Sequence, residues 1–312
     1  MANTVFVFCE HGTDGIRPVT FELIGKGREL GSVTAVSISP LSEGELQSLS
    51  EAGASRIIAC GCKEPDVLTC IDALCSLIGK YAPDILLVGA TAFGRSMAPG
   101  VAAQLKTGLT ADCTGLEIDP ETGLLRQTRP AFGGNLMATI VCPDTKPQIA
   151  TVRPKVFRAL SFEGKAEVIT EHVDVPKSPV ELIKRELNKG DISIADADVL
   201  VSVGQGIGTQ ENIRLAEKLA EKLGGTLSAS RPMIDNGILP YARQVGQTGR
   251  TVAPRLYIAL GISGAVQHMA GVAAKHIIAV NTDPDAPIFA YADYAIRQDC
   301  GTFLHAILDK LN

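Results

Sequence analysis

Tryptophan is absent from this sequence of 312 residues, and aromatic residues of all kinds make up only 4% of it. Proteins that hold single-stranded nucleic acid stack its bases on exposed aromatic rings, so the composition argues against that class. Positive charge is also scarce, since the chain has 29 Lys and Arg residues but 34 Asp and Glu residues, which gives a net charge of −5. We therefore expect no nucleic-acid partner, since a phosphate backbone is bound by a basic face.

Long hydrophobic runs are missing as well. The most apolar stretch, residues 257–280, is interrupted by glycines and by polar side chains such as Gln267 and Lys275, so we expect no membrane span. No basic segment precedes an apolar one at the start, which predicts that there is no signal peptide. None of the eight cysteines forms a Cys-x-x-Cys pair, and we expect free thiols. Together these absences predict a soluble, cytoplasmic protein.

Material for buried cores is abundant, since 46% of the residues are hydrophobic. Over the first 115 residues, short apolar runs alternate with segments of helical periodicity. The runs cover 5–8, 32–39, 55–59 and 84–88, and the helical segments cover 18–29, 41–52, 64–81 and 95–105. Such alternation predicts β-α-β crossovers and a parallel sheet with helices on both faces. Residues 114–168 instead alternate between hairpin signals at 119–123 and 143–147, which predicts an antiparallel edge added to that sheet.

The best domain boundary lies between residues 173 and 198, where prolines and a charged run interrupt the pattern. Strand and helix signals then alternate again to the end of the chain. We therefore predict an α/β protein of two domains, 1–190 and 191–312, of which the second is Rossmann-like.

A glycine-rich turn follows the first predicted strand of the second domain. The apolar run 199–203 leads into Gly204-Gln205-Gly206-Ile207-Gly208 and then into a helix. Glycines let backbone N–H groups approach a phosphate, and the amino end of a helix attracts negative charge. The Rossmann fingerprint is incomplete, however, because Thr209 replaces the third glycine and Arg231 follows the second strand in place of an acidic residue.

A second strand-to-helix turn, residues 256–268, strengthens the prediction of a ligand site. Ser263 and Gly264 form this turn, and Gln267 and His268 follow it. Two glycine turns at the carboxyl ends of strands predict a ligand across the crevice between them. A polar loop at 245–250 lies between the two turns in the sequence. We find no nucleophile elbow, paired carboxylates or zinc signature, so hydrolytic chemistry is not expected.

Several of these segments resemble the alpha subunit of electron-transfer flavoprotein, the FixB family. The resemblance covers essentially all of 196–312, and the segments that carry it are 230–231, 245–249, 252–254, 256–259, 261–268 and 281–289. Looser similarity occurs in the first domain at 88–95, 129–135 and 151–154. The resemblance implies a nucleotide-hydrolase-like first domain that contacts a beta subunit, and a second domain that holds FAD.

The resemblance also implies roles for individual residues. Gly204, Gln205 and Gly206 would bind the pyrophosphate together with Ser263 and Gly264, although some family members carry Arg where Gln205 stands. Thr248 would donate to flavin N5. The other implied FAD-binding residues are Arg231 near the isoalloxazine ring, Val245, Gly246 and Gln247 along it, Gln267 and His268 at its pyrimidine side, Asn281 and Asp299 toward the ribose and adenine, and also Ser230, Ala265, Val266 and Cys300. Arg231 and His268 would stabilise the negative charge of a reduced flavin.

The implied function is to carry single electrons between an acyl-CoA dehydrogenase and another redox partner. Some family members bifurcate electrons from NADH toward ferredoxin or flavodoxin and hold a second FAD chiefly in the beta subunit, whereas others hold AMP there. Residues 129–137 favour the bifurcating kind, and both stay open. The residues alone also allow an NADP-dependent dehydrogenase, with Arg231 at the 2′-phosphate. The first domain by itself allows a nucleotide-binding module like the universal stress proteins.

Overall fold

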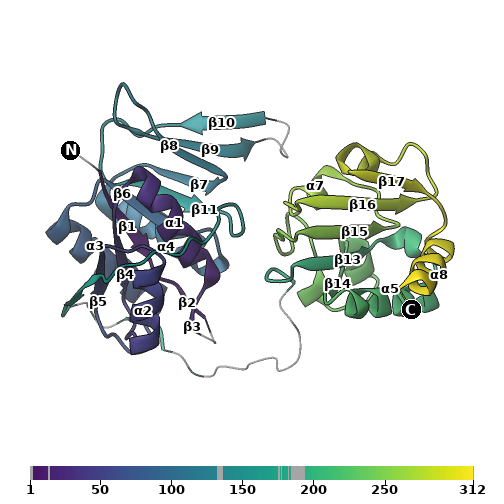
Figure 1. Ribbon diagram of the computed structural model, residues 1–312, viewed down its shortest axis with the longest axis horizontal. Coiled ribbons are helices and arrows are strands. Elements are labelled where there is room, and N and C mark those ends of the chain that lie inside the picture. Colours follow the sequence, from purple (N-terminus) through teal and green to yellow (C-terminus); the bar gives the residue numbers. More distant parts are fainter. Residues whose placement is uncertain are drawn as a thin grey trace. The chain divides into compact units, whose positions relative to one another are not determined.

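The computed structural model describes residues 3–12, 15–131, 136–174, 176, 178–181, 183 and 194–311. The chain divides into two compact units, Met1–Arg185 and Glu186–Asn312, and each contains its own parallel sheet (Figure 1). The predicted boundary between residues 190 and 191 lies outside the described residues. Within the described part of the chain, no helix is long and apolar enough to cross a membrane.

Unit 1 is built on a seven-stranded parallel sheet. Its strands follow the order β12 (Glu167–Thr170), β5 (Arg56–Ala59), β4 (Gly31–Ser37), β1 (Asn3–Phe8), β6 (Ile85–Gly89), β11 (Gln148–Val152) and β7 (Leu109–Cys113). Strand β1 shows why the sheet is buried on both faces, because Val5 and Val7 enter one hydrophobic core while Phe6 and Phe8 enter the other. Successive side chains of a strand point to opposite faces, so an uninterrupted apolar run needs cover on both.

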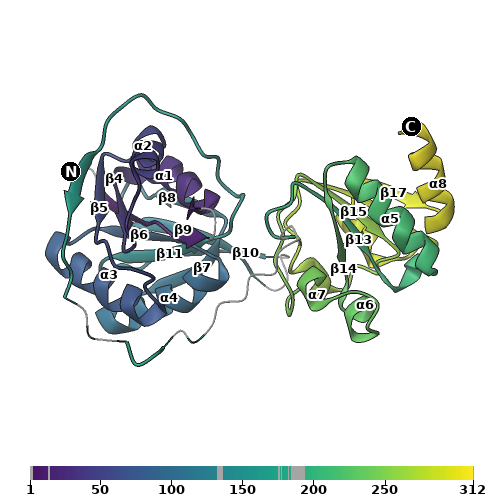
Figure 2. The same ribbon diagram turned by 90° about the horizontal axis from the view of Figure 1, so that it is seen from below.

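Helices provide that cover. Figure 2 shows α1 (Pro18–Leu30) and α2 (Glu43–Glu51) on one face and α3 (Val67–Tyr81) and α4 (Ala92–Leu105) on the other. Three of them begin at side-chain caps, since Ser42, Asp66 and Thr91 accept hydrogen bonds from backbone N–H groups in the first turns. The predicted alternation of strands and helices over the first 115 residues is thereby confirmed.

The antiparallel strands are present, but they do not extend the parallel sheet as predicted. Strands β8 (Gly115–Ile118), β9 (Leu125–Ala131) and β10 (Leu136–Ile140) form a separate three-stranded sheet. Strands β11 and β12 instead pair in parallel with β6 and β5. Residues 143–147 were predicted to form a hairpin turn, but they lead into β11. Every residue of β11 is buried, which is typical of a parallel strand inside a sheet. Of the similar segment at 129–135, residues 132–135 lie outside the described part.

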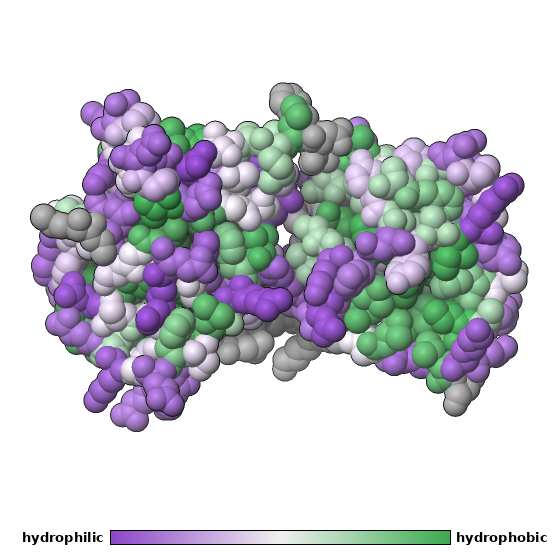
Figure 3. Space-filling view, turned by 45° about the horizontal axis from the view of Figure 1, so that its top comes forward, coloured by the Kyte–Doolittle hydropathy of each residue, from purple (hydrophilic) through white to green (hydrophobic). Residues whose placement is uncertain are grey.

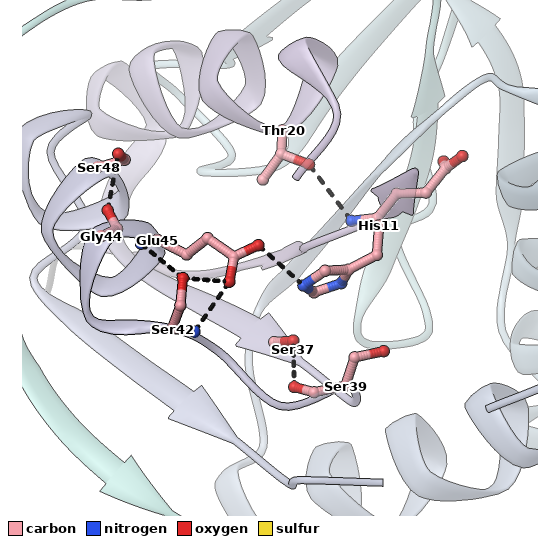
Figure 4. A network of polar contacts seen from close by, with 9 residues as sticks. His11, Thr20, Ser37, Ser39, Ser42, Gly44, Glu45 and Ser48 are labelled. Carbon is pink, nitrogen blue, oxygen red and sulfur yellow. Dashed lines mark hydrogen bonds and ion pairs between the residues drawn. The ribbon is translucent and has the colours of Figure 1, made fainter. Parts of the chain in front are cut away.

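The carboxyl edge of the unit 1 sheet is closed by polar side chains. Buried Glu10, which is 3% exposed, lies between Arg17 Nε at 2.9 Å and the Thr91 hydroxyl at 2.5 Å. Beside it, the short strands β2 (His11–Gly12) and β3 (Gly15–Ile16) place His11 Nε2 3.7 Å from Glu45 Oε1 (Figure 4). Open parallel sheets bind their ligands where the strand order reverses, which in this sheet is between the paired strands β1 and β6, and a carboxylate occupies that point here. The arrangement does not favour a nucleotide phosphate in unit 1.

A stability prediction concerns Glu22, a buried carboxyl group of α1. Burial raises the pKa of Glu22 to about 7, although the Lys155 N–H donates to its Oε2 at 2.7 Å. The folded chain therefore binds this proton more tightly than the unfolded chain, and stability is lost as the pH rises from about 4.5 toward 7. We expect Glu22→Gln to raise the free energy of unfolding by about 2 kcal/mol near pH 8 and hardly at all near pH 4.5.

Denaturant unfolding of the full chain at these two pH values measures the effect. Glu29→Gln, at an exposed position of the same helix, is the matched control and should change little at either pH. An equal gain for Glu22→Gln at both pH values, or no gain near pH 8, would contradict the prediction.

Unit 2 is a five-stranded parallel sheet. Its strands follow the order β14 (Thr226–Ala229), β13 (Val199–Val203), β15 (Leu256–Leu260), β16 (His276–Asn281) and β17 (Tyr294–Arg297). Helices α5 (Gln210–Lys222) and α8 (Cys300–Lys310) contact each other and share one core with the sheet. Short segments complete the unit, namely α6 (Arg231–Asp235), α7 (Val266–Met269), η2 (Gln205–Ile207), η3 (Tyr241–Arg243) and η4 (Pro287–Tyr291). On the face shown in Figure 3, hydrophobic and hydrophilic residues intermingle on both units.

Candidate cofactor site

The two glycine turns of unit 2 lie side by side at the carboxyl ends of neighbouring strands. Strand β13 pairs with β15 in parallel, and the chain leaves β13 toward β14 on the opposite side, so the strand order reverses between β13 and β15. Open parallel sheets bind their ligands at such a point. The predicted position of the ligand site follows from this topology.

The structure gives the glycines of these turns a role that differs from the predicted one. The N–H of Gly204 donates to Leu260 O at 2.8 Å, and the N–H of Gly206 donates to Gly261 O at 3.0 Å. A Cβ at Gly204 would lie 2.3 Å from Gly261 O. Glycine is therefore required here because the two turns pack backbone against backbone, and these two N–H groups are already paired.

The second turn supplies consecutive N–H groups that have no partner. Among the described residues, none accepts a hydrogen bond from the backbone N–H of Ser263, Gly264 or Ala265. Gly264 has a φ of +85°, and a Cβ there would lie 2.3 Å from Ile288 N, so only glycine fits. Consecutive unpaired N–H groups form a concave anion-binding site. They fit a phosphate or pyrophosphate group.

A cavity of about 450 Å³ opens at this edge of the sheet. Thirteen of the eighteen predicted residues line it: Gln205, Gly206, Ser230, Arg231, Val245, Gly246, Gln247, Thr248, Ser263, Ala265, Gln267, His268 and Asn281. Seven further lining residues were not predicted from the sequence: Pro232, Gln244, Gly261, Ile262, Asp283, Ala286 and Pro287. Three of these seven, Pro232, Gln244 and Ile262, directly adjoin predicted residues, so continuity along the chain was the signal available for them.

Five predicted residues do not line this cavity. Gly204 and Gly264 shape the turns as described above, and Val266 is the first residue of α7. Asp299 caps α8 by accepting from the Thr302 N–H at 2.9 Å, and Cys300 is buried in the core beneath that helix. Their assignment to a bound cofactor stays a prediction. Asn281 does line the cavity, and its amide group bonds to Ile262 O and to the Asp283 N–H.

The polar loop at 245–250 is held in place by a buried glutamine. Gln244, which is 3% exposed, donates from Nε2 to the Thr248 hydroxyl at 3.0 Å, while Tyr241 donates to Thr248 O at 2.8 Å. The N–H of Gln247 donates to Gln267 O at 2.7 Å and ties the loop to α7. Because its oxygen already accepts from Gln244, the Thr248 hydroxyl keeps its own hydrogen for a ligand.

Burial disfavours the charged form of His268. Its side chain is 8% exposed, and burial lowers its pKa to about 4, with the Val245 backbone opposing the shift. Nε2 lies 2.8 Å from the Tyr257 hydroxyl, whereas Nδ1 is buried without a hydrogen-bond partner among the described residues. An orphaned buried nitrogen in the wall of a cavity fits a polar ligand.

Arg231 carries a permanent charge and, in contrast to the buried His268, its side chain is 63% exposed. It begins α6, and its Nε lies 3.1 Å from Asp235 Oδ2 one turn later. Buried Ser230 precedes it, and the Ser230 hydroxyl does not cap the helix. The cavity therefore has one cationic side chain, one neutral imidazole and a row of unpaired N–H groups.

These features define a two-unit α/β protein with a nucleotide-cofactor site at the edge of its second sheet. Residues 5–177 match the electron transfer flavoprotein domain, and residues 193–273 match the electron transfer flavoprotein FAD-binding domain. The chain belongs to the electron transfer flavoprotein family, in which it is an alpha subunit, and its cofactor is FAD. The recognition and the cofactor predicted from the sequence are thereby confirmed, and the reading as an NADP-dependent dehydrogenase is not.

Three relatives match the chain over nearly its whole length. The chain is 42% identical to the electron transfer flavoprotein subunit alpha of Clostridium acetobutylicum, over 95% of this chain and 93% of the relative. It is 39% identical to the acryloyl-CoA reductase electron transfer subunit beta of Anaerotignum propionicum, over 98% and 95%. It is 41% identical to subunit LctC of the NAD(+),ferredoxin lactate dehydrogenase of Acetobacterium woodii, over 98% and 75%. The family implies a heterodimer with a beta subunit that takes part in electron transfer.

Proposed function

We propose that this chain holds FAD in the unit 2 cavity and, with its beta subunit, passes single electrons between an acyl-CoA dehydrogenase and a second redox partner. The observation that carries the proposal is the cavity between the two glycine turns, where unpaired N–H groups, one cation and a buried imidazole line a single space. FAD supplies one-electron and two-electron redox chemistry when bound. The chain's residues bind it, orient it and set its electrostatic surroundings.

Each part of the cavity has a distinct task in this proposal. The N–H groups of Ser263 and Ala265, which line the cavity on either side of Gly264, bind the pyrophosphate, and Gln205 and Gly206 form the wall beside it. The Thr248 hydroxyl, oriented by Gln244, donates to flavin N5. Asn281 and Asp283 also line the cavity, and in this proposal they contact the ribose.

In this proposal the complex bifurcates electrons from NADH, and its second redox partner is a ferredoxin or a flavodoxin. Two relatives support this choice by name, one as an electron transfer subunit of an acryloyl-CoA reductase and one as a subunit of a lactate dehydrogenase that uses NAD(+) and ferredoxin. Bifurcation needs two flavins in the heterodimer, one in this cavity and one in the beta subunit. The competing arrangement, a simple carrier with AMP in the beta subunit, needs only one.

The nucleotide content of the purified heterodimer distinguishes the two arrangements. We expect about two FAD and no AMP per heterodimer if it bifurcates, determined after acid extraction. The matching activity is NADH-dependent reduction of ferredoxin or flavodoxin, coupled to reduction of an acyl-CoA dehydrogenase. One FAD with one AMP would exclude bifurcation and leave single-electron carriage in place, whereas no FAD at all would overturn the whole proposal.

A further inference from the structure

A buried hydrogen bond connects the centre of the unit 2 sheet to the cavity. Tyr257 is the second residue of β15 and is fully buried, and its hydroxyl lies 2.8 Å from His268 Nε2. The two rings are tilted by 49°, with their centroids 6.3 Å apart. His268 follows the second glycine turn and lines the cavity. Nothing in the sequence predicted this pair, because Tyr257 stands within an apolar strand.

The environment of the pair decides which atom carries the imidazole proton. Burial keeps His268 neutral, so only one ring nitrogen is protonated, and burial also raises the pKa of Tyr257, so that its phenol remains protonated. The Ser202 hydroxyl acts as a donor toward the phenol oxygen of Tyr257, so the phenol directs its own O–H to Nε2, which lies within reach as the acceptor. The proton of His268 then lies on Nδ1. The Val245 backbone opposes the lowering of the His268 pKa and so favours a protonated ring nitrogen, but Nδ1 makes no hydrogen bond of normal geometry with it.

We propose that Tyr257 is a positioning residue, which holds His268 as the Nδ1–H tautomer and so leaves Nδ1–H as the group that donates to the flavin. Nδ1 suits this role because it is buried and has no partner among the residues described. Nε2 does not, because its lone pair is committed to Tyr257. The inference rests on the proposed function, since it requires FAD in this cavity. A hydrogen bond on the neighbouring nitrogen commonly sets the tautomer of a functional histidine.

Tyr257→Phe in the FAD-loaded heterodimer tests the proposal, because it removes only the hydroxyl. We expect normal FAD content, and nitrogen-15 spectra of labelled histidine that change from one His268 tautomer to a mixture. The equilibrium constant for accepting the first electron should fall about fivefold, which is about 40 mV for a one-electron couple. Tyr294→Phe, at a tyrosine that is 65% exposed, is the control and should change neither readout. A role in packing alone would lower stability without moving the tautomer.

Two substitutions of His268 provide a second test that does not require Tyr257→Phe to fold. The amide nitrogen of asparagine occupies the position of Nδ1, whereas that of glutamine reaches the position of Nε2. We expect His268→Asn to retain a first-electron potential closer to that of the wild type than His268→Gln does. The reverse order would overturn the proposal. An unchanged tautomer and potential in Tyr257→Phe, with FAD content normal, would also overturn it while leaving the proposed function intact; wild-type heterodimer without FAD in this cavity would overturn the proposed function itself.

Discussion

Arg231→Ala is expected to lower the potential at which the bound FAD accepts its first electron by about 65 mV, because it removes about 1.5 kcal/mol of stabilisation of the new negative charge. Arg231 carries a permanent charge at the cavity. The value is set at the lower end of the range for charged hydrogen bonds, since the side chain is 63% exposed and solvent screens it. Binding of oxidised FAD should change much less, because that ring is uncharged.

Two further variants control for this effect. Arg231→Lys keeps the charge and should recover most of the potential, whereas Asp235→Asn removes the paired carboxylate and should raise the potential above that of the wild type. Spectroelectrochemical titration of the FAD-loaded heterodimers measures all three. An unchanged potential in Arg231→Ala with normal flavin content would show that Arg231 does not act on the flavin.

His268 is expected to act differently from Arg231. With its pKa lowered to about 4 by burial, it is uncharged between about pH 6 and 8, so its contribution comes from an N–H dipole and not from a cation. We therefore expect the smaller change of potential at His268. The sequence implied that His268 stabilises negative charge but did not show whether its imidazole is charged, because burial of a side chain is a tertiary property.

The features predicted best are those that depend on residues close together in the sequence. Strand and helix alternation, the two glycine turns and the polar loop at 245–250 are local patterns, and the structure places the turns together because the carboxyl ends of parallel strands share one edge. Thirteen predicted residues line one cavity for that reason. The antiparallel strands of unit 1 were also detected by their turns, but local signals do not tell which sheet a strand joins.

The features that the sequence did not predict depend on contacts that form only when the chain folds. No pattern in the sequence indicated that Gln244 orients Thr248, because the burial of Gln244 follows from the packing of the loop. Tyr257 fitted an ordinary apolar strand, and only the folded chain brings its hydroxyl to His268. Gly204 and Gly206 were predicted to bind phosphate, and the structure shows that both lie where one turn packs on the other, which a phosphate-binding pattern does not distinguish.

The location of FAD is the claim on which the other assignments depend. Gly206→Val is unsuitable for testing it, since a Cβ there would already lie 3.0 Å from Gly261 O and disturb the turns. Ser263→Leu is better, because Ser263 lines the cavity and a leucine side chain would exclude the phosphate from the unpaired N–H groups. Ser96→Leu, at an exposed position of α4 in unit 1, is the matched control.

The most direct measurement is the number of FAD molecules per purified heterodimer in the wild type, Ser263→Leu and Ser96→Leu, each followed through stepwise reduction. We predict that Ser263→Leu loses one FAD relative to the wild type, together with the one-electron step that Arg231 controls, and that Ser96→Leu loses neither. Equal flavin content in all three proteins, with the one-electron step unchanged in Ser263→Leu, would contradict the account and place the cofactor elsewhere.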